Sequence, residues 1–238
     1  KGGAGPSTLE FTRWPPEVVV RAAGGARRWL LRNAVALVWA AAAVGGVLRL
    51  ARYLDNRSLW LDEAFLAINL TEKPFSDLFG RLEFLQSAPP GFLALEKAAV
   101  ALFGDSEYAL RLFPLVASLA ALALFAHVAL RLLPPLAAVL AMVLFAANSR
   151  LLYYSSEVKP YSSDTAVALL LVALALYAYG GERPFRRLLP LGVVAPAAVW
   201  LSFPAIFVLG AVTVPLALRP LGRGDRRQAA AVLTGAAI

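Results

Sequence analysis

Cysteine is absent from the sequence and histidine occurs once. These absences exclude disulfides, thiol nucleophiles and zinc sites built from Cys and His. Charged residues are also scarce, at 16% of the chain. No metal-ligand set is predicted, and assistance by a divalent metal is left open.

Apolar residues dominate what is present. They make up 60% of 238 residues, and the mean hydropathy is +0.67. Several uninterrupted apolar runs place this composition outside the soluble range, and they predict an all-α, polytopic transmembrane bundle. The net charge of +8 lies in short basic clusters between these runs, as orientation signals do, so nucleic-acid binding is not expected. The chain ends inside a fresh apolar run, residues 229–238, so we expect it to be part of a longer protein.

The first third of the chain predicts one membrane span between two polar segments. Residues 1–32 are Gly-rich, Pro-rich and basic, which predicts a flexible cytoplasmic segment. Residues 33–238 form the expected transmembrane domain, and its first span is residues 33–54, with Arg49 and Arg52 snorkelling at the outer end.

Residues 55–108 mix charge with helical periodicity over apolar runs too short to cross a bilayer. We therefore expect an outside loop whose amphipathic helices lie in the membrane interface. The first helix is predicted from the spacing of Phe75, Leu78, Phe79, Leu82 and Leu85. The second would bury Phe92, Leu95, Ala99 and Phe103, with Glu96 and Lys97 on another face.

The rest of the chain alternates between apolar runs and short polar segments. Spans are expected at 109–130, 132–147 and 165–179, with an outside loop at 148–164. Residues 188–218 carry no charge, yet basic clusters flank them on both sides, so two short helices turning near 202–204 are predicted. This topology puts a net charge of +10 on the cytoplasmic side and −2 outside.

The acids are concentrated in the expected outside segments, and one adjacent pair follows the first span. Asp62 and Glu63 lie in residues 59–65, LWLDEAF. One reading makes Asp62 a helix N-cap with Glu63 in the first turn. The other makes Asp62 a general base, because partial desolvation between Trp60 and Phe65 would raise its basicity. Both readings can hold together.

Residues 157–161, EVKPY, end the second outside loop. Tyr161 and Lys159 suit an ordinary interfacial anchor at headgroup level. Alternatively, Lys159 and Arg111 lie on the same face as Asp62 and neutralise a departing phosphate. No expected span carries an acid in its apolar interior, which lowers the case for a coupled transporter.

Four segments together resemble the GT-C class of membrane glycosyltransferases, in the branch of the protein O-mannosyltransferases, the aminoarabinose-to-lipid A transferase and rhizobial lipopolysaccharide sugar transferases. The resemblance covers about residues 33–218, the N-terminal portion of such proteins. It rests on the pair Asp62 and Glu63 and on three stretches, SAPPGF at 87–92, FGDSEYALRLFP at 103–114 and YSSEVKPY at 154–161.

The resemblance implies a monosaccharide donor linked to polyprenyl phosphate, an outward-facing site, and inverting transfer to a lipid, glycan or protein acceptor. It implies that Asp62 is the general base, and that Glu63, Arg111, Glu157, Lys159 and Tyr161 contribute to substrate binding. The residue before the Pro-Pro pair is often His or Lys in relatives and is Ala88 here. No cofactor beyond the donor is implied.

We therefore expect a multi-pass protein of a bacterial plasma membrane, with its N-terminus in the cytoplasm and its active site outside. Two alternatives stay open at this point: a polyprenyl-lipid transporter or flippase, and a non-catalytic subunit of a cell-envelope complex.

Overall fold

The computed structural model describes residues 16–179 and 184–222, and within these ranges every regular element is a helix. This confirms the all-α prediction. The elements in chain order are α1 (Pro16–Leu54), α2 (Leu61–Glu72), the 3-10 helix η1 (Phe75–Phe79), α3 (Pro90–Phe103), α4 (Glu107–Leu132), α5 (Pro135–Ala147), α6 (Ser149–Tyr154), α7 (Tyr161–Tyr179), α8 (Pro184–Leu201) and α9 (Ala205–Gly222).

Among the described residues, three helices are long and apolar enough to cross a membrane: Arg28–Leu54 of α1, Glu107–Leu132 and Tyr161–Tyr179. They contain the expected spans at 33–54, 109–130 and 165–179. The prediction of a flexible segment at residues 1–32 is wrong for residues 16–32, which form the first part of α1. Arg, Ala and Leu residues in this stretch favour helix. Residues 1–15 lie outside the described part of the chain.

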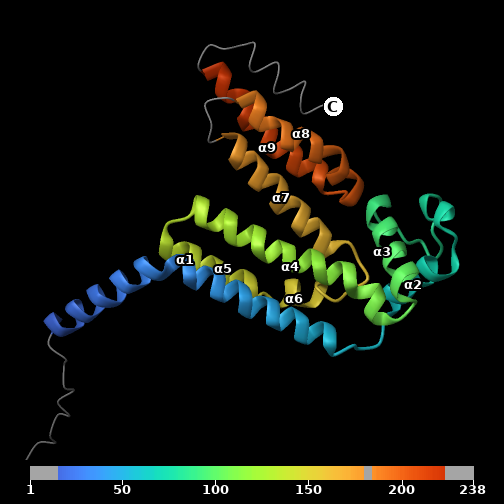
Figure 1. The fold of residues 1–238 in the computed structure, drawn as a ribbon, viewed down its shortest axis with the longest axis horizontal. Coiled ribbons are helices and arrows are strands. Elements are labelled where there is room, and N and C mark those ends of the chain that lie inside the picture. The colour runs from blue at the N-terminus through green and yellow to red at the C-terminus, as the bar shows by residue number, and fades with distance from the viewer. Residues whose placement is uncertain (1–15, 180–183, 223–238) are drawn as a thin grey trace, which may run out of the picture.

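The long helices pack side by side in chain order (Figure 1). α1 lies against α4 and α5, α4 lies against α7, and α7 lies against both α8 and α9. Apolar side chains form two clusters between these helices. One lies among α1, α4 and α5, around Val38, Ala126 and Met142. The other lies among α7, α8 and α9, around Leu171, Ala198 and Ala205. α2, η1 and α3 gather at one end of this bundle, coloured cyan to green in the figure.

Arg49 does not snorkel as expected, because its side chain is buried between three helices. Its guanidinium donates to Ser118 Oγ on α4 at 2.6 Å, and to the carbonyl oxygens of Gly45 and Ala146 at 3.0 and 3.2 Å. Gly45 permits this close approach, since a Cβ there would lie 2.9 Å from Ala146 Cβ. Internal acceptors therefore replace the water that a snorkelling arginine would reach.

The first predicted interfacial helix is wrong over most of its length. Only Phe75–Phe79 is helical, and it is a 3-10 turn that ends at Gly80. Beyond it the chain is irregular, and Phe84 and Leu85 both adopt left-handed backbone conformations, with φ of 56° and 55°. Apolar periodicity misled the prediction because Leu78 and Leu82 are both buried without belonging to one helix.

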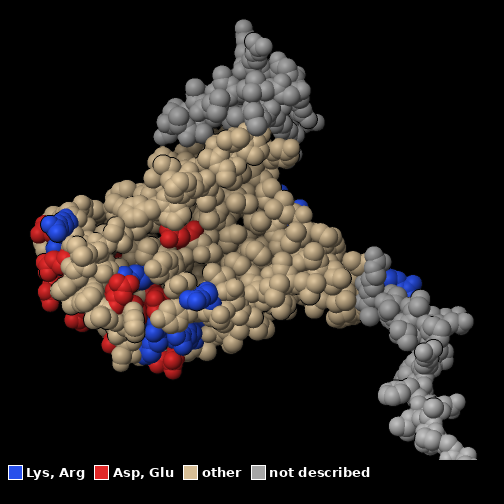
Figure 2. All heavy atoms as spheres, turned by 180° about the vertical axis from the view of Figure 1, so that it is seen from behind, with Lys and Arg blue, Asp and Glu red and all other residues tan. Residues whose placement is uncertain are grey.

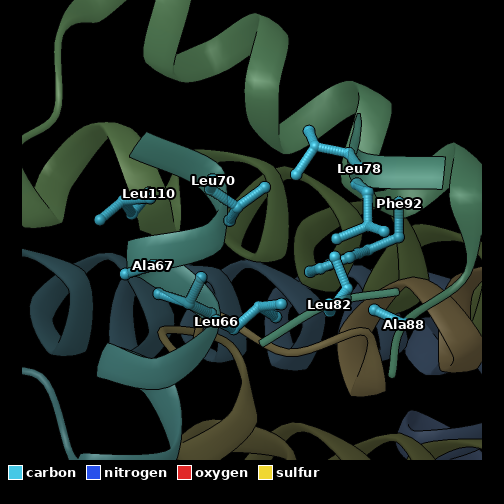
Figure 3. Close-up of a cluster of buried hydrophobic side chains, with 10 residues drawn as sticks. Leu66, Ala67, Leu70, Leu78, Leu82, Ala88, Phe92 and Leu110 are labelled. Atoms are coloured by element: carbon cyan, nitrogen blue, oxygen red, sulfur yellow. The ribbon is translucent and has the colours of Figure 1, made fainter. Parts of the chain in front are cut away.

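Leu78 and Leu82 instead belong to an apolar core that holds together residues 55–108, the outer segment (Figure 3). Side chains from α2, η1, the following loop, α3 and α4 converge there, and Val158 reaches in from the loop before α7. This core fixes α2 against α3, and so fixes the position of the acid pair at the start of α2.

The second predicted amphipathic helix exists as α3, but its faces differ from those expected. Phe92 and Ala99 are buried, whereas Leu95 and Phe103 are exposed. Glu96, expected on a polar face, is fully buried, and neither carboxyl oxygen has a hydrogen-bond partner. Burial without a hydrogen-bond partner raises the pKa of Glu96 well above its ordinary value of 4.5.

The predicted pair of helices in residues 188–218 is confirmed. α8 ends at Leu201 and α9 begins at Ala205, so the turn falls at 202–204 as expected. This turn packs on the outer segment, because Gly91 of α3 abuts Trp200, whose carbonyl oxygen would lie 2.9 Å from a Cβ at position 91. Trp200 also stacks against Phe79, with ring centroids 6.1 Å apart.

Candidate active site

Most charged side chains visible on one face of the molecule gather at the end that carries α2, η1 and α3 (Figure 2). The rest of the described surface on this face is mostly uncharged, in keeping with a bundle embedded in lipid. Two segments far apart in sequence meet at this end: the start of α2, and the loop of residues 155–160 between α6 and α7. The predicted site residues lie on these two segments and on α4.

The start of α2 places Asp62 and Glu63 on different sides of the helix. Trp60 is the N-cap residue, so the expectation that Asp62 is the N-cap is wrong by two positions. Glu63 Oε2 accepts a hydrogen bond from the backbone N–H of Trp60 at 3.0 Å, which satisfies one free amide of the helix terminus. Asp62 is left half-exposed, whereas Glu63 is fully buried.

Asp62 is held by two side chains from other segments. Lys159 Nζ lies 2.9 Å from Asp62 Oδ2, and Gln86 Nε2 donates to Asp62 Oδ1 at 3.1 Å. Lys159 Nζ also donates to Gln86 Oε1 at 2.7 Å. The three side chains therefore close a triangle in which each contacts the other two.

The electrostatics of Asp62 differ from the expectation that desolvation would raise its basicity. The Lys159 ammonium lowers the pKa of Asp62 below its ordinary value; burial opposes this, and Gln86 adds to the lowering. Trp60 cannot desolvate the carboxylate strongly, because its own side chain is mostly exposed. Asp62 is thus an ionised carboxylate at neutral pH, and it becomes a stronger base only if Lys159 moves away.

Arg111 does not lie beside Asp62 as predicted. Its guanidinium is buried and faces Glu63, with Nη2 3.3 Å from both carboxylate oxygens and Nε 3.4 Å from Oε1. It also donates to the backbone carbonyl of Arg57. The exposed fraction of its side chain is 1%, so in this structure Arg111 neutralises Glu63 and has no free donor for a phosphate at the surface.

Glu157 is also buried, and Arg57 links it to the Glu63–Arg111 pair. It forms an ion pair with Arg57, whose guanidinium also approaches Glu63 at 3.5 Å and stacks over the Tyr153 ring. Backbone completes the connection, because the Val158 N–H donates to Glu63 Oε1 at 3.1 Å. The two acids and two arginines therefore fasten the loop that carries Lys159 to the helix that carries Asp62.

Tyr161 begins α7 next to this loop, and its side chain is 44% exposed. Its ring lies 4.4 Å from the Tyr154 ring. The predicted residues thus divide into two sets. Asp62 and Tyr161 are exposed, whereas Glu63, Arg111, Glu157 and Lys159 are buried, and Lys159 reaches Asp62 from below with a side chain that is 10% exposed.

Sequence reasoning missed Gln86 and Arg57. Gln86 comes immediately before the SAPPGF stretch, which was the only local signal that it belongs to a site. Arg57 follows the first span in a polar stretch with no pattern that marks it. Within the described residues, no group of three or more His, Cys, Asp or Glu side chains is placed to hold a metal ion.

A helical membrane bundle with a charged site at one end, built from the loop after the first span and the loop before α7, is an architecture consistent with the GT-C type of membrane protein. The chain belongs to the family described as dolichyl-phosphate-mannose-protein mannosyltransferase, whose family model matches residues 87–238, more than half of the sequence. This is a family of membrane glycosyltransferases.

The matched segment contains Arg111, Glu157, Lys159 and Tyr161, whereas Asp62, Glu63 and Gln86 precede it. No curated protein and no solved structure matches the chain. The family assignment therefore rests on the family model, and the roles of individual residues rest on the geometry described above.

Proposed function

We propose that this protein transfers a monosaccharide from a polyprenyl-phosphate-linked donor to a hydroxyl of a lipid, glycan or protein acceptor, with inversion at the anomeric carbon. The observation that carries the proposal is the contact between Asp62 and Lys159. A half-exposed carboxylate and an ammonium at 2.9 Å bring together a base for the acceptor and a cation for the leaving phosphate.

The reaction balances with these two groups alone. The acceptor oxygen forms a bond to the anomeric carbon while the bond from that carbon to the phosphate oxygen breaks. The acceptor proton passes to Asp62, and the electron pair of the broken bond stays on the polyprenyl phosphate, where Lys159 offsets the charge. A phosphate stabilised in this way is a good leaving group, so no second carboxylic acid is needed to protonate it.

Inversion requires the base and the leaving group to lie on opposite sides of the anomeric carbon. The Asp62–Lys159 pair must therefore open when donor binds, with Lys159 moving from the carboxylate to the donor phosphate. Loss of the ammonium raises the pKa of Asp62 towards that of a useful base. Basicity would then appear only when the leaving group is in place, which protects the donor from premature attack by water.

The surroundings of Asp62 suit a donor with a lipid tail. Trp60, Leu61 and Leu85 belong to the segments that hold the Asp62 site, and their side chains are mostly exposed. Such apolar groups at the end of a membrane bundle favour contact with the lipid boundary. The charge asymmetry of the sequence supports the proposal that this end lies outside the cytoplasm, and we propose a bacterial plasma membrane as its location. The motifs support a proposed similarity to the aminoarabinose and rhizobial branches.

Radiolabelled donor separates this function from its rivals. Membrane vesicles that contain the protein are supplied with sugar-labelled polyprenyl phosphate and mixed acceptors. A transferase makes a covalent product whose label resists extraction of the donor lipid. A flippase would move the label across the bilayer without forming a product. A non-catalytic subunit would do neither until a partner is added, and either of these two results would contradict the proposal.

A further inference from the structure

We propose that Gln86 is a positioning residue, which anchors Asp62 Oδ1 so that Asp62 Oδ2 is the oxygen that takes the acceptor proton. This inference rests on the proposed function and assigns a role within the same site. It starts from the two contacts of one amide group: Nε2 donates to Asp62 Oδ1 at 3.1 Å, and Oε1 accepts from Lys159 Nζ at 2.7 Å.

The orientation of that amide is fixed by its partners. A carboxylate only accepts hydrogen bonds and an ammonium only donates them, so the NH₂ group must face Asp62 and the carbonyl must face Lys159. No other common side chain of this length offers a donor and an acceptor side by side without charge. A glutamate would repel Asp62, and a lysine would repel Lys159.

Gln86 is carried by a loop that is fastened to the same helix as Asp62. Asn69, buried on α2, accepts from the Glu83 N–H at 2.8 Å and donates to the Glu83 carbonyl at 3.4 Å. Phe65 of α2 stacks on Phe84, with ring centroids 4.7 Å apart. Phe84 and Leu85 are held in left-handed backbone conformations, which non-glycine residues adopt only where the surroundings impose them.

Lys159 belongs to a different segment, the loop before α7. If Lys159 moves to a donor phosphate, Gln86 and Asp62 stay together because both are fastened to α2. Asp62 then keeps its hydrogen bond at Oδ1 and loses its partner at Oδ2. The freed oxygen is the one that faces the position vacated by Lys159, where sugar and acceptor enter. Gln86 thus selects the reactive oxygen and limits rotation of the carboxylate.

The test compares Gln86→Leu and Gln86→Glu with a matched control, Glu83→Gln, on the same loop, whose surface pair with Lys73 spans 3.5 Å. Gln86→Leu removes the anchor at similar size and should lower kcat about tenfold or more, with a smaller change in KM, as expected for loss of a hydrogen bond to a charged group. Gln86→Glu places a carboxylate beside Asp62 and should move the acid limb of the kcat profile to higher pH. The control should match the wild type.

A second readout does not depend on turnover. The pH dependence of Asp62 labelling by a water-soluble carbodiimide, followed by mass spectrometry, reports the ionisation of this carboxyl directly. Gln86→Glu should shift it upwards by about one unit. An unshifted labelling curve and an unshifted kcat profile in both Gln86 variants would overturn the proposal, as would lower activity that tracks only the amount of folded protein. A shifted labelling curve without any sugar transfer by the wild type would support the Gln86 contact and contradict the proposed function instead.

Discussion

Glu63 and Arg111 form a buried ion pair whose closest atoms, Oε2 and Nη2, lie 3.3 Å apart. The acid adjacent to the proposed base is therefore used to hold the site together. Glu63 also accepts from the backbone of Trp60 and Val158, so it joins the start of α2, α4 and the loop that carries Lys159. The proposed chemistry at Asp62 depends on this support without requiring Glu63 to touch substrate.

Glu63→Ala should destabilise the protein by about 3–5 kcal/mol, because it leaves the Arg111 guanidinium buried without its carboxylate. Thermal unfolding in detergent measures the effect. The double variant Glu63→Gln with Arg111→Met should recover part of the loss, since it removes both charges together. Equal unfolding temperatures for Glu63→Ala and the wild type would show that the network contributes nothing to folding.

Lys159→Gln should raise the pKa of Asp62, because the Lys159 ammonium is the largest cause of its lowering. A lowered carboxyl pKa adds stability above its unfolded value of about 3.8, and this contribution is lost as pH falls through the lowered folded value. The variant should therefore lose this acid dependence and move the acid limb of the kcat/KM profile, which reports the free enzyme, to higher pH. Lys73→Gln, which removes a lysine whose ion pair with Glu83 does not involve Asp62, is the control. A profile that coincides with the wild type would mean that Lys159 does not control Asp62.

Glu96→Gln should flatten the dependence of stability on pH. The folded pKa of Glu96 is raised by burial, so its contribution to stability is fully present below about pH 4.5 and is lost as pH rises towards the raised value. Glutamine carries no proton to lose. Unfolding temperatures in detergent between about pH 4.5 and 8 should fall for the wild type and change less for the variant. Parallel curves for the two proteins would contradict a raised pKa of the buried Glu96.

Gly91→Ala should weaken the contact between α3 and the end of α8. A Cβ at position 91 would meet the Trp200 backbone at 2.9 to 3.1 Å, and backbone cannot rotate away as a side chain can. We expect a loss of about 1–3 kcal/mol. Gly210→Ala on α9 has no atom within 4 Å of the added methyl and should be neutral or slightly stabilising. Similar effects of the two substitutions on the unfolding temperature would rule out a close contact at Gly91.

The sequence predicted those features that depend on long apolar runs. The spans at 33–54, 109–130 and 165–179 and the turn at 202–204 follow from hydropathy, length and flanking charge, and they lie where expected. The expected span at 132–147 is an apolar helix, α5, but its 13 residues are shorter than the roughly 20 that cross a bilayer. Periodicity failed in the outer segment, where Gly80 ends η1 after one turn and buried leucines recur without a continuous helix. Arg49 and Glu96 were predicted to be solvent-accessible but are buried. The sequence around a charged residue gives no sign of its internal partners or of its burial.

Within the site, charge placement was enough to bring Asp62 and Lys159 together in the prediction, and the structure joins them. Charge placement did not show that, of these two cations, only Lys159 contacts Asp62 and that Arg111 pairs with Glu63. That pairing depends on how α4 packs against α2 and the loops. Gln86 carries no charge and belongs to no apolar pattern, so only its three-dimensional contacts identify it.

Sugar transfer by Asp62→Asn tests the central claim most directly. Asparagine keeps the shape of the side chain and an acceptor for Gln86, but it cannot take a proton from the acceptor hydroxyl. In membrane vesicles with labelled polyprenyl-phosphate sugar, transfer by this variant should fall by about a hundredfold or more, with insertion and expression unchanged. Transfer at the wild-type rate by Asp62→Asn would contradict the assignment of Asp62 as the general base.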